Sequence, residues 1–62
     1  MRELPEQGVL IEFRQIGNSV KVSAIDQSTG IEVSIVGPRS ASETQLRVSA
    51  IRKLKYVMEK KR

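Results

Sequence analysis

Basic side chains near the C-terminal end are the residues whose type and spacing could bind phosphate groups. Residues 39–62 carry eight basic and two acidic side chains, whereas residues 1–38 carry three basic and five acidic ones. Contacts of Lys and Arg with phosphates make affinity fall as salt rises. A polyanion such as nucleic acid is therefore one candidate partner; alternatively, the charges form a solvated face that keeps a small domain soluble. The candidate anion-binding residues are Arg52, Lys53, Lys55, Lys60, Lys61 and Arg62.

Catalytic chemistry is not indicated by the residue types present. The 62 residues include neither His nor Cys, which removes the commonest tunable base and the thiolate nucleophile. The same composition lacks the usual ligands of structural zinc. Asp and Glu are scattered, and no base is spaced to activate one of the serines. We therefore expect a non-enzymatic protein with no catalytic residue, no cofactor and no metal.

Apolar residues that one copy of the chain does not obviously bury form a second kind of candidate site. Clustered apolar surface usually marks a protein interface, although scattered exposed aliphatic side chains are normal. A Tyr suits an interface because it combines a large ring with a polar tip. The candidate interface residues are Leu10, Ile25, Val36, Val48 and Tyr56.

A β-hairpin is predicted to position the first of these residues. Apolar and polar residues alternate over residues 9–16, and Gly17-Asn18 suits a two-residue turn that requires positive φ. A turn at this pair sets Phe13 opposite Val22 and Ile11 opposite Ala24. The apolar residues of both strands then share one face.

A third strand and a helix are expected to follow. The loop 26–30 suits a tight turn that sets Val33 opposite Ala24, and residues 31–36 can be an edge strand that pairs with a second copy. Gly37 and Pro38 are expected to end this strand. Helical spacing runs from residue 43 to about residue 60, with an apolar stripe at Leu46, Ala50, Ile51, Leu54, Val57 and Met58. Two overlapping capping boxes, one beginning at Ser40 and one at Ser42, leave the start of the helix open.

These elements predict an α+β domain, in which a three-stranded antiparallel β-meander is followed by one C-terminal α-helix packed on the sheet (β-β-β-α). Residues 1–8 are expected to be a flexible N-terminal arm, and residues 9–62 the single domain. A core of this size offsets the conformational entropy of the chain only narrowly, so small domains usually need a further support. Without disulfides or zinc, we expect a homodimer, with another protein as a possible partner. The chain lacks a signal peptide and a membrane-spanning run, so we expect it in the cytoplasm.

The sequence also resembles a family of short, uncharacterised proteobacterial proteins. The likeness extends from Ile11 to about Lys60 and rests on Glu12-Phe13-Arg14, Gly17-Asn18, Val20-Lys21-Val22, Ala24-Ile25-Asp26, Thr29-Gly30, residues 32–38 and residues 52–57. The resemblance implies no activity, because that family has no assigned function. The working hypothesis is a small interaction module that associates with itself, and polyanion binding through the basic helix and tail is the alternative.

Overall fold

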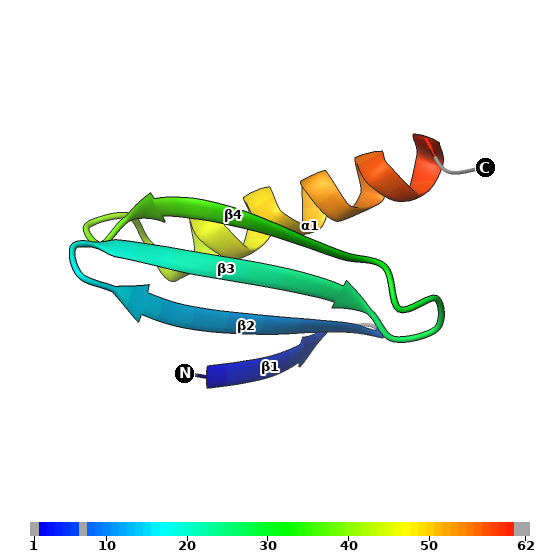
Figure 1. Cartoon of the computed structure of the whole chain (residues 1–62), viewed down its shortest axis with the longest axis horizontal. Coiled ribbons are helices and arrows are strands. Elements are labelled where there is room, and N and C mark those ends of the chain that lie inside the picture. Colours follow the sequence, from blue (N-terminus) through cyan, green and yellow to red (C-terminus); the bar gives the residue numbers. More distant parts are fainter. Residues whose placement is uncertain (1, 7, 61–62) are drawn as a thin grey trace.

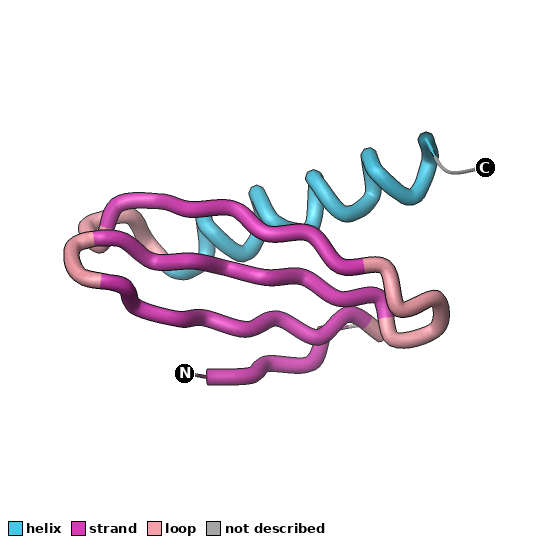
Figure 2. Tube along the Cα trace, viewed as in Figure 1, coloured by secondary structure: helices cyan, strands magenta, loops and turns pink. Residues whose placement is uncertain are grey.

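The computed structural model describes residues 2–6 and 8–60, the first of these ranges for the backbone only. One antiparallel sheet with the strand order β1-β2-β3-β4 is packed against a single helix (Figure 1). The helix contacts β3 and β4 and lies behind them in the view of Figure 2. The elements are β1 (Arg2–Glu6), β2 (Val9–Ile16), β3 (Ser19–Asp26), β4 (Glu32–Pro38) and α1 (Glu43–Lys60). The predicted meander followed by a C-terminal helix is confirmed and corresponds to β2, β3, β4 and α1.

The first strand, β1, is a difference from the sequence analysis, which expected a flexible arm over residues 1–8. Residues 2–6 instead form an edge strand that pairs with β2, with Leu4 opposite Ile11 and Pro5 opposite Leu10. Mixed charges and Pro5 hide this strand in the sequence. Proline is tolerated on an edge strand, where its missing N–H need not break the ladder. Met1 and Gln7, also assigned to the arm, lie outside the described residues.

The hairpin of β2 and β3 has the predicted register. Phe13 lies opposite Val22, Ile11 opposite Ala24, and Gly17 takes a φ of 59° in the turn. That positive φ is readily adopted by Gly and opposed by a Cβ in most other residues. The turn therefore fixes which residues of both strands point toward the helix.

The turn between β3 and β4 is organised by the carboxylate of Asp26. Its Oδ2 accepts hydrogen bonds from the Thr29 hydroxyl at 2.7 Å, the Ser28 hydroxyl at 2.8 Å and the Thr29 backbone N–H at 2.9 Å. These bonds, that of the Thr29 side chain first and that of Ser28 second, lower the pKa of Asp26 below its usual 3.8. The Asp26 N–H also donates to the Ile31 carbonyl at 2.8 Å, and Val33 lies opposite Ala24 as predicted.

The helix begins at the second of the two candidate caps. The Ser42 hydroxyl accepts a hydrogen bond from the Gln45 N–H at 3.0 Å, which satisfies one of the unpaired donors of the first turn. The apolar stripe faces the sheet, as predicted. Its buried members join the buried residues of the strands in one core, made of Ile11, Phe13, Val22, Ala24, Val33, Leu46, Ala50 and Leu54.

The helix approaches the end of β4 closely at Gly37. A Cβ placed on Gly37 would lie 2.5 Å from Cδ2 of Leu46, far inside normal contact distance. The absence of a side chain there lets Leu46 pack directly on the β4 backbone. The strand β4 runs from Glu32 to Pro38, whereas the predicted edge strand covered residues 31–36. Gly37 and Pro38, which were expected to end the strand, are its last two residues.

Candidate functional site

The sheet face that points away from α1 is covered by no described helix or strand. We call it the outer face. Alternation along the strands places on it every second residue, because the intervening residues point to the core. The outer face of the described side chains consists of Leu10, Glu12, Arg14, Ile16, Ser19, Lys21, Ser23, Ile25, Glu32, Ser34, Val36 and Pro38.

Two of these apolar side chains are strongly exposed. Val36 is 68% exposed and Ile16 is 54% exposed, and both lie near the end of the sheet that carries the β2–β3 turn. Leu10 and Ile25 lie opposite one another near the other end and are half-buried. The outer face therefore carries apolar groups at both ends.

The middle of the outer face is small and polar. Ser23 is only 7% exposed, and its Oγ lies 3.3 Å from the Oγ of Ser34 on the neighbouring strand. This hydroxyl pair satisfies both side chains without projecting above the sheet. A second surface can therefore approach the middle of the face closely.

The five candidate interface residues fall into two separate groups. Leu10, Ile25 and Val36 lie on the outer face, as the alternation predicts. Val48 and Tyr56 lie on α1, which packs on the opposite face, and they are 42% and 60% exposed. The structure does not bring the two groups together. Ile16 was not among the predicted interface residues, although the alternation that places Leu10 on the outer face places Ile16 there as well.

The candidate anion-binding residues also have different surroundings. The Lys53 Nζ donates a hydrogen bond to the Ser34 carbonyl at 2.8 Å, and the Lys60 Nζ lies 5.4 Å from the centre of the Tyr56 ring. Arg52 and Lys55 are exposed on α1. Lys61 and Arg62 lie outside the described residues.

Two backbone groups at the outer edge of β4 cannot form ladder hydrogen bonds with another strand. This matters for the prediction that the strand pairs with a second copy. Lys53 uses the outward-facing carbonyl of Ser34. Pro38 lies opposite Ser19, and the backbone N–H and C=O of Ser19 point toward Ile16 of β2. The backbone nitrogen of Pro38 therefore points to the outer edge of β4, and proline has no N–H to donate there. Lysine and proline are common means of protecting an edge strand. The Ser34 carbonyl and the Pro38 nitrogen are therefore not available to a strand that would pair with this edge.

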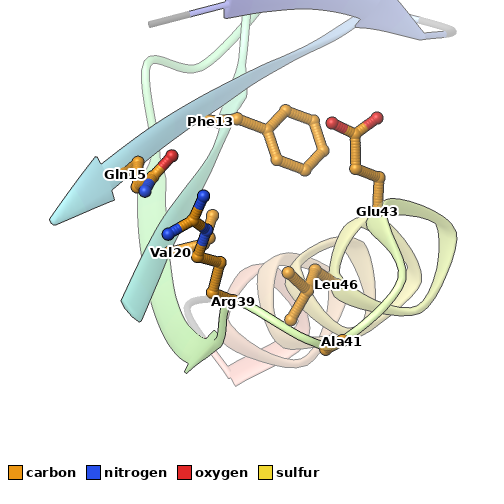
Figure 3. Close-up of a pocket in the computed structure, with 7 residues that line it drawn as sticks. All are labelled: Phe13, Gln15, Val20, Arg39, Ala41, Glu43 and Leu46. Atoms are coloured by element: carbon orange, nitrogen blue, oxygen red, sulfur yellow. The ribbon is translucent and has the colours of Figure 1, made fainter. Parts of the chain in front are cut away.

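A cavity of about 300 Å³ lies between the sheet and the segment that leads into α1 (Figure 3). The Arg39 side chain extends toward Gln15 and Val20, and Glu43 points its carboxylate toward Phe13. These polar groups can donate and accept hydrogen bonds. This cavity could not be predicted from a local motif, because its lining residues come together only in the folded chain. They are Phe13, Gln15, Val20, Arg39, Ala41, Glu43 and Leu46.

A second hollow, of about 420 Å³, follows the first turns of α1. It is lined in part by Val48 and Arg52, one member of each candidate set.

Among the described residues, no group of three His, Cys, Asp or Glu side chains could hold a metal ion. No helix of the described chain combines the length and the apolar character that crossing a bilayer requires.

Comparison with known proteins places the chain in a family. Residues 6–61 match the sequence profile of a family described as a domain of unknown function (DUF6898). The chain belongs to the DUF6898 family. The match covers β2, β3, β4 and α1 in full, which agrees with the extent of the resemblance seen in the sequence. Neither the curated proteins nor the solved structures contain a match to it.

Proposed function

We propose that this DUF6898 domain is a small non-catalytic interaction module of the cytoplasm, which associates with a second copy of itself through the outer face of its sheet. The exposure of Val36 and Ile16 on an uncovered sheet face is the observation that carries this proposal. Removing apolar surface from water contributes about 25 cal/mol per Å². A chain with so small a core gains the most from such burial.

A concentration series tests the proposal. Sedimentation equilibrium should show a species of 7.0 kDa at low concentration that converts to twice this mass as the concentration rises. Val36→Glu should shift the conversion to higher concentration, because it places a charge on the outer face. Val48→Glu, the same change at an exposed position of α1, is the matched control and should leave the series unchanged. A wild-type chain that stays at 7.0 kDa up to about 1 mM contradicts the proposal, because the free energy of association would then be weaker than about −4 kcal/mol.

Polyanion binding through the basic helix is the second candidate. The exposure of Arg52 and Lys55 supports it, whereas Lys53 and Lys60 already have contacts within the chain. Binding to a nonspecific DNA duplex should weaken steeply as salt rises. Lys55→Glu should weaken it further, and Arg39→Glu, the same type of change away from the helix, is the control. Absence of binding near 50 mM salt contradicts this candidate.

A further inference from the structure

The charges of the outer face are divided along the strands. Arg14 and Lys21 lie opposite one another in one row, which also contains Val36. The next row toward the other end contains Glu12 with the two small serines, and the row after that contains Glu32 with Leu10 and Ile25. One half of the face is therefore basic and the other half acidic.

This division selects between the two directions of a two-fold axis that keep the strands of the stacked faces nearly aligned. An axis parallel to the strands places each row over the same row of the second copy, so that Arg14 and Lys21 meet the same cations. An axis across the strands reverses their direction and places the basic row over the acidic one. Like charges brought face to face are costly, and opposite charges fix the register of an interface.

We propose that two copies stack outer face to outer face about a two-fold axis that runs across the strands near the level of Phe13; this arrangement rests on the proposed function. Phe13 is the midpoint of the stretch from Leu10 to Ile16. The axis therefore places Arg14 over Glu12 of the second copy and Ile16 over Leu10 of the second copy. Each of these contacts occurs twice, because a two-fold interface is self-complementary.

The remaining features of the face are consistent with this stacking. Stacked sheets lie about 10 Å apart, with their strands about 30° from alignment. The stacking places Lys21 of the second copy over Ser23 and Val36 of the second copy over Ser34. The small serine side chains leave room for these longer ones. The Lys53 contact with the β4 edge leaves the outer face unobstructed, since α1 lies on the other side of the sheet.

The size of the face predicts a weak dimer. Four strands spaced about 4.8 Å and seven residues rising about 3.4 Å each give a footprint of about 19 Å by 24 Å. Two such faces bury about 900 Å², and the relief of the side chains adds to this area. Specific interfaces bury at least about 1,000 Å², so the contact belongs to the small class, in which charge matching has a large influence on specificity.

Complementary charge reversals test the arrangement. Arg14→Glu alone and Glu12→Arg alone each turn two attractive contacts into two repulsive ones, so each variant should dimerise at least about tenfold more weakly than the wild type. An equimolar mixture of the two variants should recover dimerisation. In the mixed dimer, the Glu introduced at position 14 of one copy faces the Arg introduced at position 12 of the other. The second contact joins the native Glu12 of the first copy to the native Arg14 of the other, so both contacts are attractive. Native mass spectrometry identifies the mixed dimer, and far-UV circular dichroism verifies that each variant is folded.

A second pair of variants keeps the test decisive if Glu12→Arg does not fold, since Glu12 also has an interaction within its own chain. Ile16→Glu and Leu10→Lys should likewise fail to dimerise alone and dimerise when mixed. Folded variants that dimerise like the wild type, or mixtures that do not recover, overturn the arrangement while the proposed function stands. A wild-type chain that is monomeric throughout overturns the proposed function itself.

Discussion

Replacing Leu54 with Ala tests whether the contact between α1 and the sheet holds the domain together. Leu54 is 1% exposed and lies in the core with Ile11 and Val22. The change removes three carbon atoms, worth about 2.5 kcal/mol of transfer free energy at about 0.8 kcal/mol each. The cavity left behind raises the cost, and buried Leu→Ala changes cost about 3–5 kcal/mol in the best-studied case.

The expected loss is large compared with the stability of the whole domain. At about 0.05–0.15 kcal/mol per residue, a chain of this length has a free energy of unfolding of about 3–9 kcal/mol. Leu54→Ala should therefore remove at least about a third of that free energy, and all of it at the lower end of the range. Urea unfolding followed by circular dichroism at 222 nm measures the loss, at one fixed protein concentration because association shifts apparent stability.

Val48→Ala on the same helix is the matched control. Val48 is 42% exposed, so its truncation should change the free energy of unfolding by less than about 0.5 kcal/mol. Ala is also a better helix former than Val, which offsets part of the lost contact. A loss for Leu54→Ala no larger than that for Val48→Ala would refute the placement of Leu54 in the core and the packing of α1 on the sheet.

Three further changes test separate features. Hydrogen bonds, that of the Thr29 side chain foremost, lower the pKa of Asp26 in the folded state, so the unfolded state binds more protons and wild-type stability falls as the pH drops below about 4. Asp26→Asn should reduce this fall, and urea unfolding at about pH 5.5 and pH 3 measures the free energy lost between the two pH values; an equal loss in the wild type and in Asp26→Asn would contradict the interpretation. Gly37→Ala should cost about 1–3 kcal/mol by overpacking against Leu46, whereas an unchanged melting temperature would show that the Leu46 side chain moves aside at no cost. Lys53→Met keeps the aliphatic stem and removes the hydrogen bond to the β4 edge, so thermal unfolding should show a loss of about 0.5–1 kcal/mol, and no loss would mean that water replaces the bond equally well.

The hairpin and the following turn could be predicted because two independent signals agree. Turn residues with the right chemistry fix the register, and the apolar pattern requires the same register. Gly17, Asp26 and Gly30 thus set the pairing of three strands without any knowledge of the tertiary structure. The core stripe of α1 follows in the same way from its helical period.

The strand β1 could not be predicted because its own residues carry no strand pattern. Its pairing with β2 depends on backbone groups that β2 offers to any neighbouring segment. The choice of Ser42 over Ser40 as the helix cap also escapes the sequence, since both positions have a suitable residue three places on. That choice depends on the turn that follows Pro38. In this turn the Ala41 N–H donates a hydrogen bond to the Pro38 carbonyl at 3.0 Å, so the helix begins after Ala41.

The candidate site could be predicted only in part, for a related reason. Strand alternation correctly places Leu10, Ile25 and Val36 on one face. Helical spacing alone cannot say whether Tyr56 and Val48 reach that face, because the answer depends on which side of the sheet the helix occupies. The contact of Lys53 with the Ser34 carbonyl is likewise a tertiary contact between residues 19 positions apart.

The order of the strands has a consequence for how quickly the domain forms. Each strand pairs with its neighbour in sequence, and the helix returns directly onto the last two strands. Pairing of the strands closes only short loops, so little chain entropy is lost before these contacts form. Mixed α/β domains fold at rates between those of helical bundles and those of all-β barrels. We therefore expect faster folding than for an all-β barrel of similar size, which limits the time that nascent chains spend with apolar strands open to aggregation.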